Sequence, residues 1–153
     1  MSSVFDSQAF NANLFFPRGD TAPTPGNSDE IQVEVEPKTY VHIRRHPSPE
    51  ARFSLLFFHG NGEIVSDYDN FAEVFSALGA ELVMADFRGY GRSTGCPTLR
   101  NSLEDAHKVF NHLKSIGKFK EKVCIMGRSL GSAPTLELCA KRSDIAACIL
   151  ESG

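Results

Sequence analysis

A serine between two glycines is the residue of this sequence whose setting best suits covalent chemistry. Gly127-Arg128-Ser129-Leu130-Gly131 has the form G-x-S-x-G. In a nucleophile elbow, such a serine sits on a strained bend between a strand and a helix, which pushes its hydroxyl clear of both. A Cβ two residues before or after the serine would meet neighbouring backbone, so glycine suits both Gly127 and Gly131. The alternative is a glycine-flanked serine in an ordinary loop.

The residues on either side of this motif favour the elbow. Residues 123–126 form an apolar run short enough for a buried parallel strand. After the turn, Ala133, Leu136 and Ala140 recur at helical spacing. Ser129 would then lie at a helix N-terminus, where unpaired N–H groups and the positive end of the helix dipole point. An oxyanion formed during acyl transfer would carry its charge there.

A second candidate group follows another apolar run. Residues 53–58, FSLLFF, end abruptly in His59-Gly60-Asn61-Gly62-Glu63, which predicts a buried strand leading into a glycine-rich turn. Such a turn lets backbone N–H groups face a cavity, and in hydrolases with a nucleophile elbow an amide from this loop is an oxyanion donor. Asn61 is the residue expected at that position. The alternative is a plain tight turn.

A third glycine-rich segment, residues 86–93, follows the short apolar run 82–85. Its glycines invite comparison with a dinucleotide-binding fingerprint, but the third glycine, Gly95, comes one residue late. Pro97 then interrupts the place where a helix should begin. Asp86 is interpreted as a turn-former that accepts backbone N–H bonds rather than as a catalytic acid.

The remaining patterns predict the elements that would position these loops. An alternation with a period of two predicts an antiparallel strand pair over residues 31–35 and 40–44. His42 and His46 are interpreted as surface residues of this strand region rather than as catalytic groups.

Helical patterns separate the apolar runs. One predicted helix follows capping residues 66–69 and carries an apolar stripe, and a second spans about 101–117. The run 145–150 predicts a last strand. Strands that alternate with helices indicate a mostly parallel sheet flanked by helices. The stripe of the first helix is Phe71, Val74, Phe75 and Leu78.

Length and composition predict one globular domain. The chain has 153 residues, of which 41% are hydrophobic, enough for a real core. Residues 1–30 are rich in proline and glycine and predict an irregular lead-in that only Leu14-Phe15-Phe16 could anchor. Residues 31–153 form the expected domain.

Charge and cysteine usage exclude several classes of partner. The net charge is −3 and the basic residues are scattered, so we expect no nucleic acid and no anionic membrane as a partner. The four cysteines lack metal-ligand spacing and are predicted to be mostly buried thiols. His107 and His112 are five residues apart and cannot form a two-histidine metal pair. No signal peptide or transmembrane run is visible, which predicts a cytoplasmic protein.

Three motifs in this order resemble the α/β-hydrolase superfamily. The segments HGNGE, ADFRGYGRS and GRSLGSAPTLEL are most similar in sequence to the Bem46-type branch. This branch groups with α/β-hydrolase-domain serine hydrolases and serine-aminopeptidase-like sequences. The resemblance covers roughly residues 31–153. It implies the strand order 1-2-4-3-5-6, Ser129 as nucleophile, and the backbone amides of Asn61 and Leu130 as oxyanion hole. Gly60, Gly62 and Arg128 are the candidate substrate-binding residues. The resemblance also implies hydrolysis of esters, thioesters or amides without a cofactor.

The sequence departs from the family pattern after Ser129. In this fold an acid and then a histidine follow the serine along the chain. No histidine follows here, and the later acids are Glu137, Asp144 and Glu151. Glu151 ends the last strand and is the candidate acid, although it has no histidine to orient. We therefore expect the N-terminal part of a hydrolase, truncated after the sixth strand.

Three functions follow from these observations. The first is a serine hydrolase of a small-molecule or acylated substrate that works through an acyl-enzyme on Ser129, with its base outside this chain. The second is a catalytically inactive scaffold or partner-binding form. The third, nucleotide binding, rests only on the glycine turns. The apolar last strand also predicts self-association through an exposed sheet edge.

Overall fold

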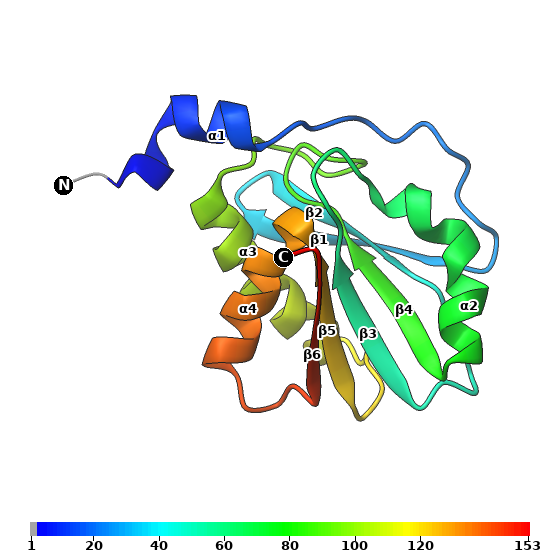
Figure 1. The fold of residues 1–153 in the computed structure, drawn as a ribbon. Helices are drawn as coiled ribbons and strands as arrows, with labels where there is room; N and C mark the ends of the chain where they lie inside the picture. The colour runs from blue at the N-terminus through cyan, green and yellow to red at the C-terminus, as the bar shows by residue number, and fades with distance from the viewer. Residues whose placement is uncertain (1–2) are drawn as a thin grey trace.

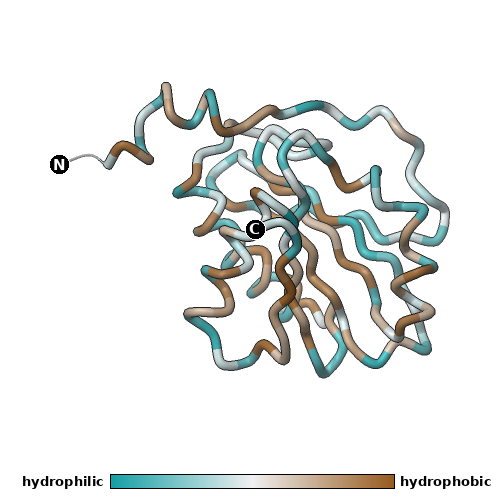
Figure 2. The backbone as a smooth tube through the Cα atoms, in the orientation of Figure 1, coloured by the Kyte–Doolittle hydropathy of each residue, from teal (hydrophilic) through white to brown (hydrophobic). Residues whose placement is uncertain are grey.

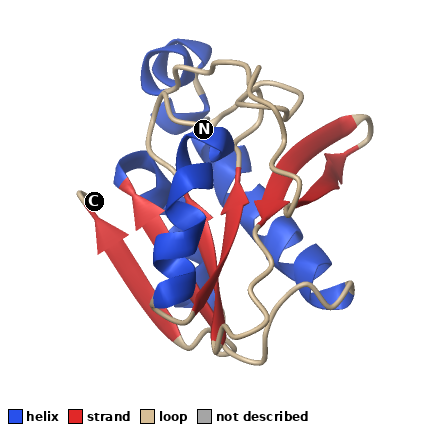
Figure 3. Ribbon diagram, turned by 90° about the vertical axis from the view of Figure 1, so that its right-hand side faces the viewer, coloured by secondary structure: helices blue, strands red, loops and turns tan. Residues whose placement is uncertain are grey.

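The computed structural model describes residues 3–153 and contains one six-stranded sheet with helices on both faces (Figures 1 and 3). The strands are β1 (Asp29–Glu36), β2 (Thr39–Arg45), β3 (Phe53–Phe58), β4 (Ala80–Ala85), β5 (Val123–Arg128) and β6 (Ala147–Glu151). The α-helices are α1 (Gln8–Leu14), α2 (Ala72–Ala77), α3 (Leu99–Ser115) and α4 (Ser132–Lys141). Short 3-10 turns are η1 (Val4–Asp6), η2 (Val65–Phe71) and η3 (Ser129–Gly131).

The sheet order is β1-β2-β4-β3-β5-β6, as the resemblance implied. β1 and β2 form the predicted antiparallel pair, β2 joins β4 antiparallel, and the other pairings are parallel. In the β3–β5 pairing, Phe58 lies opposite Gly127. Because parallel strands end at the same edge, the loops after β3 and β5 leave the sheet side by side.

The central strands are buried on both faces, which is why they read as continuous apolar runs. Leu56 and Phe58 face a large core built with α3 and α4, whereas Leu55 and Phe57 face a smaller cluster under α2. Figure 2 shows this apolar centre as brown tube along the middle strands. Among residues 3–153, no helix is both long and apolar enough to cross a membrane.

Two predicted apolar stripes do not lie where the sequence placed them. Phe71, Val74 and Leu78 are exposed, because η2 takes up the first turns and leaves α2 only six residues long. In α4, Leu136 is exposed, and Thr135 and Leu138 are among the residues that face the core instead. The tight turn that leads into α4 fixes its rotation, so tertiary packing decides which face is buried.

The lead-in and the cysteines also differ from expectation. Residues 8–14 form α1 rather than irregular chain, and Phe15 enters the core while Phe16 is exposed. Cys96 and Cys148 are exposed, and Cys124 and Cys139 are half-buried, so the prediction of mostly buried thiols was wrong. All five residues of β6 are exposed, as expected for an uncovered edge.

Candidate active site

Ser129 lies on a sharp bend between β5 and α4. β5 ends at Arg128, η3 begins at Ser129, and α4 follows directly. The φ of Ser129 is +48°, a left-handed value that non-glycine residues rarely adopt. Ser129 is exposed to solvent. A strained, exposed serine at the end of a parallel strand is the geometry that a nucleophile elbow requires.

The two flanking glycines are required by close backbone contacts. A Cβ on Gly127 would lie 2.3 Å from the carbonyl oxygen of Gly131 and 2.5 Å from Oγ1 of Thr135. A Cβ on Gly131 would lie 2.0 Å from the carbonyl oxygen of Phe58. Any side chain would therefore drive α4 away from β5 or from the end of β3.

The loop after β3 lies against this bend. A Cβ on Gly60 would come within 3.6 Å of the Arg128 carbonyl oxygen, and Gly131 packs on the carbonyl oxygens of Phe58 and His59. The amide of Gly60 donates to Oε2 of Glu63 at 2.6 Å. This bond folds the loop back on itself and takes the Gly60 amide out of reach of a ligand.

The amides of Asn61 and Leu130 are available to a ligand. Among residues 3–153, the Asn61 amide has no hydrogen-bond acceptor. Leu130 is the second residue of η3, and the first amides of a helix have no partner within it. The loops that carry these two donors touch one another, which is the arrangement an oxyanion hole needs.

Arg128 and Glu63 form a charged rim beside the bend. The Arg128 guanidinium pairs with Glu63 and reaches Oη of Tyr68 at 3.3 Å. Tyr68 donates to Oε2 of Glu63 at 2.8 Å. Burial raises the pKa of Tyr68 to about 12; Arg128 opposes this rise and Glu63 adds to it. Glu151 lies on the same rim, with Oε1 3.5 Å from Nε of Arg128.

The histidines of the central strands are buried, which corrects the interpretation of His42 and His46 as surface residues. His42 is fully buried, with Nδ1 3.0 Å from Asp86 Oδ2 and Nε2 2.7 Å from Glu30 Oε2. His46 is also buried, 3.2 Å from Asp69. Residues 86–93 and η2 cover this face of β2. The alternation of polar and apolar residues along β2 therefore does not mean that its polar face is exposed to solvent.

Asp86 links two of these histidines beneath the loops. Its Oδ1 accepts the Val65 amide at 3.0 Å and lies 3.1 Å from Nε2 of His59, while Oδ2 faces His42. Burial alone would raise the pKa of Asp86, but the bonds from His42 and His59 outweigh it and hold the pKa at about 2. Asp86 thus accepts a backbone N–H as predicted, from a distant segment, and anchors loops rather than its own turn.

No complete triad lies within residues 3–153. No imidazole or carboxylate of this part of the chain hydrogen-bonds to the Ser129 hydroxyl. His59 is turned toward the Gly60 carbonyl at 2.8 Å and toward Asp86, and His107 pairs with Glu137 on the far helices. These residues also contain no group of three His, Cys, Asp or Glu side chains that could hold a metal ion.

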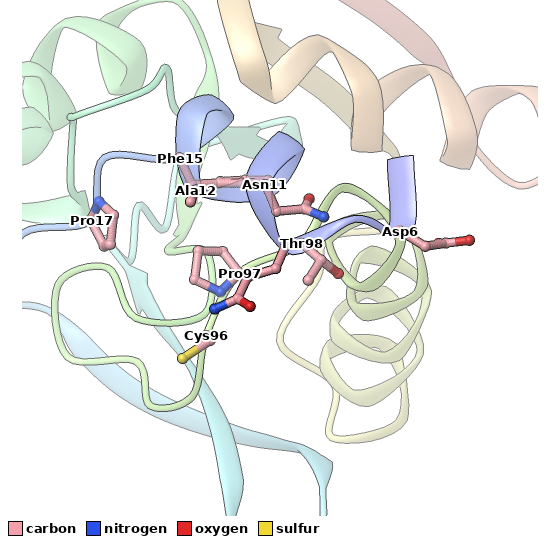
Figure 4. A pocket seen from close by; sticks show the side chains of 9 residues that line it. Asp6, Asn11, Ala12, Phe15, Pro17, Cys96, Pro97 and Thr98 are labelled. Atoms are coloured by element: carbon pink, nitrogen blue, oxygen red, sulfur yellow. The ribbon is translucent and has the colours of Figure 1, made fainter. Parts of the chain in front are cut away.

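One apolar cavity lies away from this bend. It has a volume of about 430 Å³ and lies between α1 and the segment before α3. Its mostly apolar lining includes Ala12, Phe15, Cys96 and Pro97 (Figure 4). Ser129 does not line it. The candidate active site is therefore an open surface at the carboxyl edge of the sheet and not this cavity.

Sequence comparisons identify the family. A family model described as serine aminopeptidase, S33, matches residues 49–153. The bem46 protein of Schizosaccharomyces pombe is 33% identical over 149 residues, which cover 90% of this chain and 50% of that protein. The α/β-hydrolase domain-containing protein aho-3 of Caenorhabditis elegans is 38% identical over 108 residues, which cover 69% of this chain and 32% of that protein. The chain thus spans between a third and a half of the length of these relatives.

Solved structures show the same fold. The Pyrococcus furiosus esterase Pf2001 superposes with a TM-score of 0.71 at 17% identity, over 88% of this chain and 56% of that one. A CIB-like hydrolase from Thermoplasma acidophilum gives a TM-score of 0.62 at 22% identity, over 80% and 61%. Together with the sheet order and the bend at Ser129, these matches are decisive. The chain belongs to the α/β-hydrolase superfamily, as a Bem46-like member of the family described as serine aminopeptidase, S33.

Proposed function

We propose that the full-length protein is a serine hydrolase that works through a covalent acyl-enzyme on Ser129. The observation that carries this proposal is the left-handed backbone of an exposed serine, held between two glycines that tolerate no Cβ. Such strain costs on the order of 1–3 kcal/mol and persists where function needs it. An ordinary loop serine would not require it.

The proposed reaction follows from the groups around the bend. The Ser129 oxygen attacks the acyl carbonyl carbon while a general base takes its proton, and the new oxyanion accepts hydrogen bonds from the amides of Asn61 and Leu130. The intermediate collapses to an ester on Ser129, and the departing alcohol, thiol or amine receives the proton. Water repeats the sequence and releases the acid. The base is proposed to lie in sequence outside these 153 residues.

The substrate class is proposed as an ester, thioester or amide, either a small molecule or an acylated partner. The Pyrococcus furiosus neighbour is named an esterase and the matching family a serine aminopeptidase. Both names describe acyl transfer to water. Arg128 and Gly62 remain proposed substrate contacts at the rim. Gly60 is proposed only for close approach, because its amide is already bound to Glu63.

Glu151 has no histidine to orient among residues 3–153. Its side chain is half exposed and its nearest charged partner is Arg128. A triad acid must instead orient a histidine. Our proposal therefore keeps Glu151 as a rim carboxylate unless a histidine from the rest of the protein reaches it.

A fluorophosphonate probe tests the assignment of Ser129. We expect the full-length protein to be labelled and Ser129→Ala to lose all labelling. Ser143→Ala is the matched control, because Ser143 is exposed, lies 14 residues further along the chain, and is not part of the bend. Labelling that survives Ser129→Ala, or labelling lost equally in both variants, would remove the proposal.

The second candidate function is a non-catalytic scaffold. It is favoured by the unassisted hydroxyl of Ser129, since no histidine within residues 3–153 bonds to it. A full-length protein that is folded by circular dichroism yet unreactive toward the probe would support this reading over the enzyme.

A further inference from the structure

The segment Leu14–Arg18, here called the strap, crosses the carboxyl edge of the sheet. In Figure 1 it leaves α1 and runs over the ends of the parallel strands, on the same side as η3. The strap is held near both of its ends, by a backbone bond at one and a ring contact at the other. The Gly91 amide donates to the Arg18 carbonyl at 2.8 Å, and Phe15 packs edge-on against Phe87. The strap thus lies at the same edge of the sheet as the bend at Ser129.

The side chain of Asn61 binds the strap at two points. Its Nδ2 donates to the Leu14 carbonyl at 2.6 Å, and its Oδ1 accepts the Phe16 amide at 3.0 Å. The side-chain amide of Asn61 thus both donates to and accepts from the backbone of the strap, as a residue of a neighbouring strand would. The side chain is therefore fixed while the backbone amide of the same residue stays unpaired.

Tyr90 completes this contact from below. Its hydroxyl donates to Oδ1 of Asn61 at 2.5 Å and accepts the Phe16 amide at 2.8 Å. The ring is fully buried and packs on His59 and Phe87. A hydroxyl held on a buried ring is a rigid reference point for an otherwise glycine-rich loop.

The backbone groups next to Asn61 are also bound. The Gly60 amide donates to Oε2 of Glu63 at 2.6 Å. The Gly62 carbonyl accepts from Nε of Arg18 at 2.7 Å. Of the amides at positions 60 and 61, that of Asn61 is left for a ligand.

We propose that the strap, Asn61 and Tyr90 form a clamp that positions the Asn61 amide as an oxyanion donor. Tyr90 and the Asn61 side chain are positioning residues, because they act through the loop and not on the substrate. The inference rests on the proposed hydrolase function. It adds that the N-terminal segment is a working part of the site and not a lead-in.

Tyr90→Phe in the full-length protein tests the clamp, because it removes one oxygen and leaves the ring. We expect kcat for a p-nitrophenyl ester to fall about 10- to 100-fold, since loss of a whole oxyanion donor costs about 10²- to 10³-fold. KM should change less than about threefold, because the ground-state carbonyl hardly uses this donor. Binding of a trifluoromethyl ketone, which forms the tetrahedral adduct, should weaken by the same factor as kcat.

Tyr40→Phe is the matched control, because Tyr40 is a half-exposed strand residue whose hydroxyl has no partner among residues 3–153. It should leave all three quantities unchanged. Asn61→Ala serves if Tyr90→Phe does not fold, because Asn61 is only partly buried and keeps its backbone amide after substitution. It should reproduce the fall in kcat.

Hydrogen exchange of the 59–64 peptide separates the clamp from the hydrolase proposal. Tyr90→Phe should speed this exchange about tenfold or more relative to Tyr40→Phe. A lowered Tm with kcat, inhibitor binding and exchange unchanged would overturn the clamp. If the wild-type protein shows no labelling at Ser129, the hydrolase proposal fails. Faster exchange would then still support the clamp as a loop-holding device, and unchanged exchange would reject it.

Discussion

At the level of single residues, the site requires two positions that have no side chain. Gly127 and Gly131 let two strands and a helix meet within van der Waals contact around Ser129. The Asp86 carboxylate lies beneath these loops, where it contacts the imidazoles of His42 and His59 and accepts a backbone amide. The glycines allow the close packing at the bend, and the buried hydrogen bonds of Asp86 hold the neighbouring loop that begins at His59.

Gly131→Ala should destabilise the protein by about 3 kcal/mol or more, because its Cβ would lie 2.0 Å from the Phe58 carbonyl oxygen. Gly26→Ala is the control, since a Cβ there meets nothing within 4 Å. Urea unfolding of both variants measures the difference. Equal midpoints for the two would contradict the contact.

Asp86 should make stability depend on pH in the acid range. Its pKa is about 2 in the folded protein, below the ordinary aspartate value of 3.8, so the unfolded chain binds more protons in the acid range. The resulting stabilisation, about 2 kcal/mol, is fully present above pH 3.8 and is lost as pH falls toward 2. Urea unfolding between pH 6 and pH 3 should show a smaller acid loss in Asp86→Asn than in wild type. The same slope in both proteins would argue against this role.

At the scale of elements, the parallel strands end together and gather the loops, while the outer strands behave differently. β6 is exposed along its whole length and carries Ile149 and Leu150 on an unpaired edge. β1 forms the other edge, where Val33 and Val35 are buried and the residues on either side of them are exposed. β2, the next strand in, buries His42 and Arg44.

The open edge predicts self-association of the 153-residue chain. Ile149→Lys should shift it toward monomer, because a charge on an edge strand blocks pairing with a second chain. Leu78→Lys is the control, since Leu78 is equally apolar and 65% exposed but lies on a helix exit. Analytical ultracentrifugation across a concentration series measures the shift. A wild-type chain that stays monomeric at high concentration would count against it.

At the scale of the whole molecule, a buried ion network joins segments that are distant in sequence. Arg44 is fully buried, with Nε 2.6 Å from Glu30 and Nη1 2.6 Å from Asp69. Asp20 approaches the same guanidinium at 3.6 Å. The network therefore ties the N-terminal segment, β1, β2 and η2 to one charge.

Arg44→Met should cost about 3–5 kcal/mol of unfolding free energy, because it leaves buried carboxylates without a partner. Arg100→Met removes an exposed pair with Asp6 and should leave the free energy of unfolding nearly unchanged, because water screens the pair. Chemical denaturation of the two variants gives the comparison. A cost at position 44 as small as that at position 100 would mean that water reaches the network.

Local patterns of neighbouring residues are enough to predict several features of this chain. The bend at Ser129, its glycines and the long helix α3 appear as predicted from the residues, whereas the strand order was implied only by the family resemblance. These features follow from backbone geometry and short-range periodicity, which act over one turn or one strand.

Contacts between distant segments set which layer covers each face of the sheet and which side chains meet, and no local pattern encodes those contacts. Asn61 and Leu14 are 47 positions apart, and His42 and Asp86 are 44 positions apart. Alternation along β2 shows that His42 and Arg44 share a face, but it cannot show that another layer buries that face. A polar side chain in a strand pattern reads as solvent-exposed because its buried partners lie elsewhere in the chain.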